Sequence, residues 1–272
     1  MLEKQRAQRV WGATPAGSAF AKGLDPGTKE FFESVSRRRN GYELRSVLKL
    51  IPFTAFTGSK VLEVGCGAGY DALEFCRAGA EYTGIDIAFE NILRTKKHLA
   101  LYGYWPKAVQ GDAECLSFPD QAFDAVFSNG VLHHTPDMGQ SFREIRRVLR
   151  RDGTFWVILY NRRSVFYGLT LYLFHHILKG GYRSCKFGER LAKIEYTTSG
   201  ELPLVNAYTR REVASLLRQA GFTVGGAWVR KLNREDFPRV YPFLWRWIPQ
   251  TVLDWIGSGF GWYIITKAIR TA

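Results

Sequence analysis

Short apolar runs alternate with segments of helical character between residues 60 and 160 of this chain. The runs predict buried strands, and the segments between them predict helices. The expected strands are 60–64, 81–86, 106–110, 123–128 and 153–160, and the expected helices are 69–78, 89–102 and 138–150. This alternation predicts an α/β fold with a Rossmann-like, doubly wound and mostly parallel sheet, whose ligands gather at the carboxyl ends of the strands.

The N-terminal part has a different pattern. Residues 1–27 are rich in Gly, Pro, Ala and Ser with little apolar periodicity, so we expect a loose arm. Helical spacing follows from Thr28 and again over 42–51, where Pro52 ends the second helix. These two helices are expected to cap the core.

An aromatic segment, 164–178, follows the core and is flanked by Arg162, Arg163 and Lys179. It predicts a helical lid over the ligand edge of the sheet. The segment is too short to span a bilayer, which takes about 20 apolar residues. A basic-flanked aromatic helix is also typical of a membrane interface, and this alternative stays open.

The C-terminal part predicts a helix and the last two strands of a seven-stranded sheet. The helix has its N-cap at Thr209 and ends at Gly221. Strands near 223–231 and 260–267 are expected to pair with each other. Residues 237–260 are rich in Trp and Pro and are expected to pack on the lid or to contact a partner or a bilayer. The tryptophans in question are Trp245, Trp247 and Trp255.

Length and composition fit one folded domain with appendages. The chain has 272 residues, of which 46% are hydrophobic, enough to bury an α/β core. The expected regions are an N-terminal arm and helical cap (1–58), a ligand-binding core (59–160), a lid insertion (161–207) and a C-terminal completion of the sheet with the Trp-rich insertion (208–272).

The first strand runs directly into three glycines at alternate positions, Gly65, Gly67 and Gly69. Because these residues have no Cβ, the backbone N–H groups of the turn can press against a ligand. Asp86 lies 21 residues after Gly65, close to the roughly 20-residue spacing of a ribose-binding carboxylate. The turn therefore predicts a nucleoside cofactor.

Two details distinguish between such cofactors. The third glycine comes one residue earlier than in the dinucleotide fingerprint GxGxxG. Glu63, two residues before Gly65, would repel a pyrophosphate and suits a cationic ligand such as a sulfonium. Both details disfavour a nicotinamide oxidoreductase.

Two further motifs follow in order, Gly111–Glu114 after the third strand and Phe123–His134 over the fourth. With them, residues 59–160 resemble the class I S-adenosylmethionine-dependent methyltransferases of the bacterial small-molecule type. The resemblance implies S-adenosylmethionine as the cofactor. It implies these cofactor-binding residues: Glu63, Gly65, Gly67 and Gly69 in the methionine-binding turn, Asp86 and Ile87 at the ribose, Asp112 and Ala113 at the adenine, Ser128 and Asn129 at the end of the fourth strand, and Tyr42 from the cap, where Arg38 is a second candidate.

His133 and His134 follow the fourth strand, where the acceptor pocket lies in the family that the chain resembles. The sulfonium already carries an activated methyl group, so the protein chiefly aligns the acceptor with the S–CH₃ bond. An acceptor hydroxyl or ammonium must lose a proton, and a histidine with an ordinary pKa of about 6.5 is a suitable base. We therefore predict His133 and His134 as catalytic residues. The alternative is that one ring only holds the loop.

The chain is strongly basic, with a net charge of +13. The arginines are dispersed, and no nucleic-acid-binding module accompanies them, so a solvated basic surface is expected rather than a nucleic-acid partner. The four cysteines show neither a CxxC pair nor metal-ligand spacing, and no secretory leader is recognisable. We expect free thiols in a reducing cytoplasm, and no metal site is predicted.

Three functional hypotheses remain. The first is a cytoplasmic enzyme that methylates an oxygen, nitrogen or carbon atom of a small metabolite or biosynthetic intermediate. The second keeps this chemistry but places the acceptor at a membrane, as a quinone or lipid precursor, with the protein in peripheral contact. The third is a catalytically inactive partner subunit that only binds the cofactor.

Overall fold

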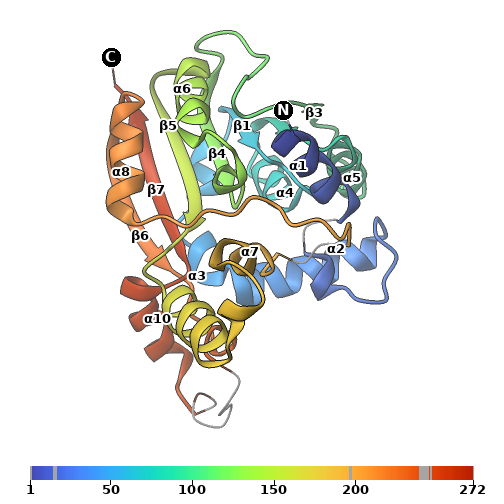
Figure 1. Ribbon diagram of the computed structural model, residues 1–272. Coiled ribbons are helices and arrows are strands. Elements are labelled where there is room, and N and C mark those ends of the chain that lie inside the picture. Colours follow the sequence, from blue (N-terminus) through green and yellow to red (C-terminus); the bar gives the residue numbers. More distant parts are fainter. Residues whose placement is uncertain (1, 15–16, 196–197, 239–244, 246, 272) are drawn as a thin grey trace.

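A computed structural model describes residues 2–14, 17–195, 198–238, 245 and 247–271 (Figure 1). Within these residues, seven strands form one sheet in the order β3-β2-β1-β4-β5-β7-β6. Strands β1 to β5 pair in parallel, whereas β7 pairs antiparallel with both β5 and β6. The strands are β1 (Lys60–Val64), β2 (Glu81–Asp86), β3 (Lys107–Gln110), β4 (Phe123–Asn129), β5 (Leu149–Tyr160), β6 (Phe222–Arg230) and β7 (Tyr263–Arg270). The predicted fold class is confirmed.

Helices cover both faces of this sheet. One apolar layer joins the strands to α6 (Met138–Val148) and α8 (Arg210–Gln219). The other joins them to α3 (Arg45–Leu48), α4 (Tyr70–Arg77) and α5 (Phe89–Ala100). Successive strand residues alternate between the two layers, as the pleat of a strand requires. Both faces are therefore buried, and the carboxyl edge of the parallel strands is left for a ligand.

The C-terminal elements follow the sequence closely. Thr209 accepts from the backbone N–H of Glu212, and the Glu212 side chain accepts from the N–H of Thr209, which makes a complete capping box for α8. Gly221 ends this helix with a positive φ of 83°. The last strand starts three residues later than expected, because α10 (Gln250–Phe260) continues up to it.

The expectation of a loose N-terminal arm is wrong. Residues 2–13 form the helix α1 (Leu2–Ala13), and Arg94 of α5 donates to the carbonyl oxygens of Trp11 and Gly12 at its end. The helix has only a weak apolar face, so its periodicity did not reveal it, and tertiary contacts hold it in place. Residues 15–16 of the expected arm lie outside the described residues.

The cap differs in detail from its prediction. The helix α2 (Lys29–Arg38) begins at Thr28, whose side chain accepts from the N–H of Phe31, as expected. A π-helical turn over 39–43 and the short α3 replace the single helix expected over 42–51. This change of helical register decides which arginine of the cap points toward the sheet edge.

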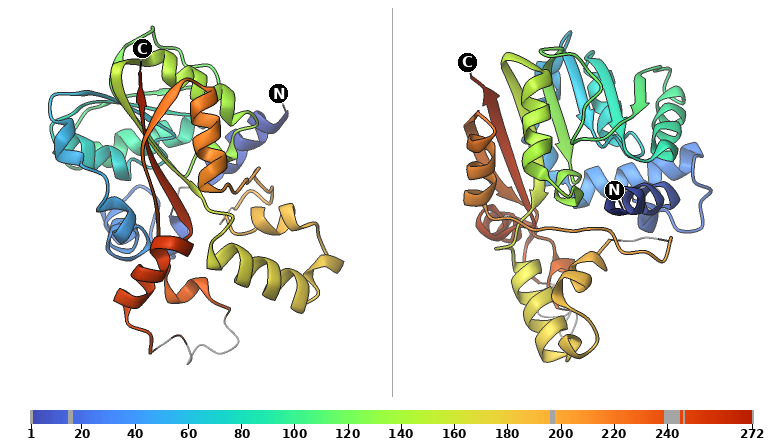
Figure 2. Two further views of the ribbon diagram at one scale, coloured as in Figure 1. Left: turned by 90° about the vertical axis from the view of Figure 1, so that its left-hand side faces the viewer. Right: turned by 45° about the horizontal axis from the view of Figure 1, so that its top comes forward.

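The lid and the Trp-rich insertion extend from the same end of the molecule (Figure 2). The lid consists of a π-helical segment, η5 (Phe166–Leu178), and α7 (Phe187–Ala192). Leu169 near the start of η5 and Leu253 of α10 belong to one apolar cluster, so the two insertions pack on each other. Residues 239–244 and 246 of the Trp-rich insertion lie outside the described residues.

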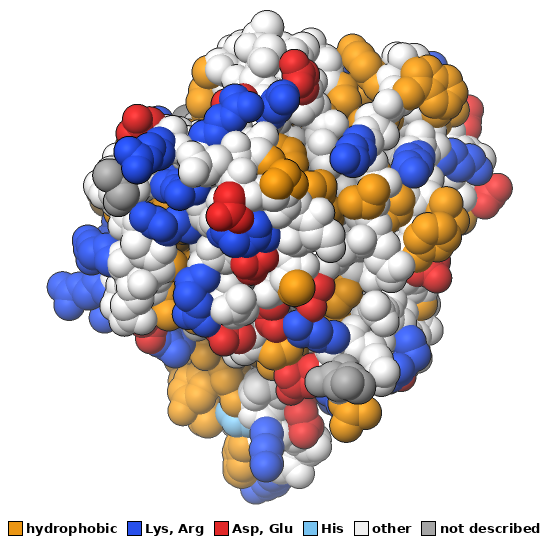
Figure 3. Space-filling model, turned by 90° about the horizontal axis from the view of Figure 1, so that it is seen from above, with side chains coloured by type: hydrophobic (Ala, Val, Ile, Leu, Met, Phe, Trp, Pro, Cys, Tyr) orange, Lys and Arg blue, Asp and Glu red, His pale blue; other side chains and the backbone are white. Residues whose placement is uncertain are grey.

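Basic side chains are spread over the surface. Figure 3 shows Lys and Arg side chains distributed over one face of the molecule and mixed with acidic ones, rather than gathered in one patch. Several form ion pairs, such as Arg147 with Asp120 and Glu144. This distribution fits the predicted solvated surface.

His98 connects three parts that surround the ligand edge. Its ring stacks on Phe32 of α2 at a centroid distance of 4.1 Å, and Nδ1 lies 2.8 Å from the carbonyl oxygen of Ala68 in the glycine turn. Burial lowers the pKa of His98 from 6.5 to about 4. The folded protein therefore holds this imidazole in its neutral form.

We predict that His98 makes the protein acid-sensitive. Its folded pKa is below its unfolded pKa, so its contribution to stability is complete above about pH 6.5 and is lost as the pH falls toward 4. Urea unfolding across this range should show a steeper loss of stability in the wild type than in His98→Asn, whose amide can still donate to Ala68. An equal loss in the two proteins would contradict this role.

Candidate cofactor and acceptor site

Two adjoining cavities lie at the carboxyl ends of β1, β2 and β4. The first, the edge cavity, has a volume of about 170 Å³ and is lined by Asp86, Ile87, Asp112 and Ala113 among others. The second, the lid cavity, has a volume of about 440 Å³ and includes Phe166 of the lid. Both are lined by the following residues: Trp11, Gly65, Gly67, Asn129, Gly130 and His134. The glycine turn and the end of β4 thus form the junction of the two cavities.

Only glycine fits at Gly65 and Gly69 of the glycine turn without strain. Gly65 and Gly69 have φ values of 82° and 79°, a conformation that is unfavourable for residues with a Cβ. A Cβ on Gly65 would lie 2.2 Å from a methyl carbon of Val131, and one on Gly69 would lie 2.9 Å from Leu99. The turn therefore packs against its neighbours on one side while it lines the junction on the other.

Asp86 ends β2 and is held by three donors. One carboxylate oxygen accepts from the N–H of Gly67 at 3.0 Å, and the other accepts from the N–H of Ala88 and the amide of Asn91. Burial raises the pKa of Asp86, and the backbone N–H groups oppose that shift. The carboxylate is thus fixed at the wall of the edge cavity, where the resemblance places the ribose.

The residues predicted to bind the adenine, Asp112 and Ala113, also line the edge cavity. Asp112 makes a contact with α1 that the sequence did not predict. Asp112 accepts from Lys4 of α1 at 2.6 Å, and Lys4 also pairs with Glu114 at 2.5 Å. The helix α1 therefore covers this part of the cavity and holds the carboxylate that the resemblance assigns to the adenine amino group.

Glu63 is buried and hydrogen-bonded within the protein. The residue is only 2% exposed, and its carboxyl group accepts from the hydroxyl of Tyr82 at 2.5 Å. Burial and the nearby Asp71 raise the pKa of Glu63 well above its ordinary value. Glu63 also lines the lid cavity, so its contact with the cofactor stays a prediction. Ser128, another predicted cofactor residue, is buried, donates to the carbonyl of Val64 and lines neither cavity.

The cap places a different arginine at the site than the sequence suggested. Arg38 pairs with Glu235 and lies over the ring of Tyr42 at 4.3 Å, and neither Arg38 nor Tyr42 is among the described residues that line the two cavities. Arg39 does line the lid cavity and donates to Asp71 at 2.5 Å. Arg37, Arg38 and Arg39 are consecutive in the sequence, but the π-helical turn that begins at Arg39 could not be predicted from it.

Asp71 connects the cap to the end of β4. Besides Arg39, it accepts from the amide of Asn129 at 3.0 Å. Asn129 is therefore oriented at the junction by a residue that the sequence analysis did not name. Arg39 is the candidate for the cofactor's carboxylate, because it is the cap cation that lines this cavity.

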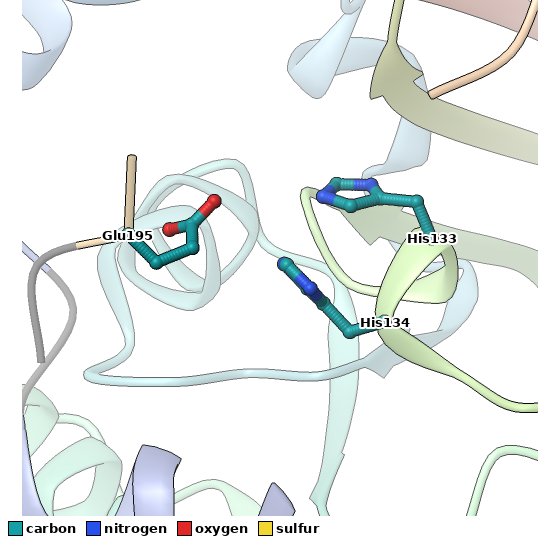
Figure 4. A group of neighbouring side chains, drawn as sticks. All are labelled: His133, His134 and Glu195. Atoms are coloured by element: carbon teal, nitrogen blue, oxygen red, sulfur yellow. The ribbon is translucent and has the colours of Figure 1, made fainter. Parts of the chain in front are cut away.

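His133 and His134 lie together with Glu195 of the lid (Figure 4), and we call these three residues the histidine cluster. His134 lines both cavities, and its Nδ1 is 2.6 Å from the carbonyl oxygen of Leu204. A carbonyl only accepts, so Nδ1 carries the hydrogen, and Nε2 of the neutral ring has a free lone pair.

The surroundings keep both imidazoles neutral. Burial lowers the pKa of His133 well below its ordinary value and also lowers the pKa of His134. Glu195 accepts from the hydroxyl of Tyr160 at 2.6 Å. Sequence reasoning missed Glu195 because it lies in the lid, far from the two histidines in the chain and without a motif.

Comparison with known proteins shows what the core of this chain is similar to. Residues 62–157 match the methyltransferase domain family. A sterol 24-C-methyltransferase of Gibberella zeae is 40% identical over 103 residues, or 37% of this chain and 27% of that protein. The ubiquinone biosynthesis O-methyltransferase of Azorhizobium caulinodans is 28% identical over 168 residues, or 60% of this chain and 64% of that protein. The chain thus spans less than two thirds of the length of these relatives.

A solved structure shows the same fold. The YcgJ protein of Bacillus subtilis aligns with a TM-score of 0.55 and 19% identity, covering 84% of this chain and 99% of that chain. The solved structure shows the fold alone; the family match over residues 62–157 bears out the resemblance of the core to the class I S-adenosylmethionine-dependent methyltransferases and supports the cofactor that the motifs predict.

We predict that Asp86→Asn weakens cofactor binding by about 10- to 100-fold, because hydrogen bonds to a charged group contribute about 1.5–3 kcal/mol. Calorimetric titration with S-adenosylmethionine measures this effect. The control is Asp120→Asn, whose side chain is 70% exposed and remote from both cavities. Equal affinities of the wild type and Asp86→Asn, with unfolding temperatures also equal, would contradict the assignment.

Proposed function

We propose that this protein transfers the methyl group of S-adenosylmethionine to a small acceptor that binds in the lid cavity. One observation carries the proposal: the edge cavity and the lid cavity meet at Gly65, Gly67 and Asn129. With the nucleoside beside Asp86, the sulfonium falls at this junction, and its methyl group faces the lid cavity. An acceptor there is held in line with the S–CH₃ bond and away from water.

The lining of the lid cavity supports an acceptor with a large apolar or aromatic part. Its aromatic side chains include Tyr160 at the end of β5, Phe166 of the lid, and Trp262 and Tyr263 where β7 begins. Tyr160 and Trp262 stack on each other at 4.4 Å. The relatives named for sterol methylation and ubiquinone biosynthesis also suggest acceptors of this kind.

The histidine cluster supplies the basic group at the acceptor end. The Nε2 lone pair of His134 is available, because Nδ1 is committed to Leu204. An acceptor hydroxyl that loses its proton here becomes the nucleophile for the methyl carbon. The cofactor leaves as the neutral thioether S-adenosylhomocysteine.

We predict that His134→Asn lowers kcat by about 100- to 10,000-fold, the usual contribution of a general base. The assay follows S-adenosylhomocysteine formation with a panel of phenols, quinols, sterols and fatty acids. The matched control is His175→Asn, a lid histidine that lines neither cavity. Unchanged kcat in His134→Asn would remove His134 from the chemistry.

The same assay tests the third hypothesis. Cofactor binding by calorimetry, with no S-adenosylhomocysteine formed from any acceptor of the panel, would support a catalytically inactive binding subunit instead.

A second candidate function places the acceptor in a membrane. Among the described residues of the lid and the Trp-rich insertion, nine large apolar side chains are exposed, and Trp247 and Trp255 are 84% and 76% exposed. We call these nine side chains the apolar tip, which consists of Tyr172, Leu173, Ile177, Leu178, Tyr182, Trp247, Val252, Trp255 and Phe260. Within the described part of the chain, no helix has the length and apolarity to cross a bilayer.

Charge favours an anionic surface as the partner of the apolar tip. Residues 161–195 contain seven basic and two acidic side chains. Tryptophan and tyrosine are typical of the membrane–water interface, and each basic residue near an anionic surface contributes about 1 kcal/mol. A protein docked in this way would have its lid cavity beside the lipids.

We predict that the protein sediments with vesicles that contain anionic lipids, and that Trp255→Ser reduces the bound fraction. Trp105→Ser is the matched control, because Trp105 is 83% exposed but lies outside the apolar tip. Binding should weaken at high salt, which screens the basic side chains. Equal sedimentation of the two variants and the wild type would exclude the apolar tip as the contact.

A further inference from the structure

Three potential ligand atoms converge in the histidine cluster. One ring nitrogen from each of His133 and His134 and a carboxylate oxygen of Glu195 all lie within 4.8 Å of one another. In Figure 4 the three side chains point toward one common volume, the histidines from the turn after β4 and Glu195 from the lid. Neutral imidazole and carboxylate are the ligand types of catalytic zinc sites.

His133 is left without a hydrogen-bonding partner by the rest of the described structure. It is 0% exposed, and among the described residues neither Nδ1 nor Nε2 has a partner. An unsatisfied buried polar group costs about 1–3 kcal/mol. A group from outside the protein chain, bound at one of these nitrogens, would give the ring the partner that it lacks among the described residues.

The other two members have the supporting contacts that metal ligands usually have. A metal-binding histidine donates its other ring N–H to a carbonyl or carboxylate, and a metal-binding carboxylate is hydrogen-bonded in turn. Nδ1 of His134 meets the carbonyl of Leu204, which leaves Nε2 for a metal ion. The Tyr160 hydroxyl donates to one oxygen of Glu195, which leaves the second oxygen available.

We propose that His133, His134 and Glu195 bind one divalent transition-metal ion of the zinc type, with three protein ligands and an open position toward the lid cavity. Ligand atoms of a tetrahedral zinc site lie roughly 3.4 Å apart, given bonds of about 2.0–2.2 Å. Binding therefore draws the three side chains together. It fixes the lid, through Glu195, against the turn after β4.

Electrostatics agree with this geometry. A metal ion binds imidazole in its neutral form, and the Leu204 carbonyl fixes the neutral tautomer of His134 in which Nε2 is free. The cation would also balance the charge of Glu195 in a largely aromatic surrounding. Arg39 and Lys231 also line the lid cavity, but each donates to another carboxylate, Asp71 and Asp236.

The open position suggests a role in the reaction. In the metal-bound protein Nε2 of His134 is a ligand and no longer the base. An acceptor oxygen bound at the open position would instead have a lowered pKa, because a zinc-type ion stabilises the deprotonated form. This role rests on the proposed function, whereas metal binding itself does not. The sequence gives no motif for such a site, because two adjacent histidines and a distant glutamate match no known metal-ligand spacing.

The test is a titration of the untagged, chelator-treated protein with Co²⁺, a spectroscopic substitute for Zn²⁺. We expect one equivalent to bind with the visible absorption of a four-coordinate Co²⁺ ion, and Zn²⁺ to displace it. Because metal binding competes with protons, the affinity should fall as the pH is lowered. Absence of this spectrum in the wild type would overturn the proposal.

Matched variants locate the ion. Glu195→Gln keeps an oxygen that accepts from Tyr160 but loses the charged ligand, and we expect affinity to fall by more than about 100-fold. Tyr160→Phe removes only the supporting contact and should cost about 10- to 100-fold. His175→Gln should bind like the wild type. Equal affinity of Glu195→Gln and the wild type would place the ion elsewhere and overturn the proposal.

Fold and function are followed separately. Thermal unfolding of each variant shows whether it folds, and Glu195→Gln keeps the test valid even if a His133 variant does not fold. Calorimetry with S-adenosylmethionine reports on the proposed function independently of the metal. Cofactor binding and methyl transfer that persist in the metal-free protein would contradict the metal's role in the reaction, and would leave the proposed function standing.

Discussion

The hydrogen bonds of the Asp86 carboxylate are the contacts on which the rest of the site depends. One oxygen holds the N–H of Gly67 in the turn after β1, and the other holds Ala88 and Asn91 at the start of α5. A single buried carboxylate thus fixes two neighbouring strand ends relative to each other. The glycine turn keeps its shape because these bonds and the close packing of Gly65 on Val131 act together.

Around this fixed edge lie parts of the chain outside residues 62–157, the part that matches the methyltransferase domain family. The helix α1 covers the edge cavity through Lys4, the cap contributes Arg39, and the lid contributes Glu195. A shared fold does not determine the substrate, so the acceptor must be inferred from these additions. Together with the aromatic side chains that line the lid cavity, the histidine cluster suits an acceptor with an apolar body and one reactive atom.

The sequence predicted those parts of the fold and site that local pattern controls. Strand–helix alternation placed the sheet, and the spacing of Gly65 and Asp86 placed the nucleoside edge. Prediction from the sequence failed for those parts whose structure depends on tertiary contacts. The helix α1 has too weak an apolar face to be recognised, and a π-helical turn exchanged Arg38 for Arg39. Glu195 comes to His133 only through the path of the lid, which no local spacing encodes.

The central claim is that S-adenosylmethionine binds with its ribose on Asp86 and its sulfur at the junction of the two cavities. A crystal structure of the complex with S-adenosylhomocysteine tests this claim most directly. The account predicts both ribose hydroxyls on Asp86 and the sulfur beside Gly65 and Asn129, with its open side toward His134. A nucleoside bound away from Asp86, or a sulfur separated from the lid cavity, would contradict it.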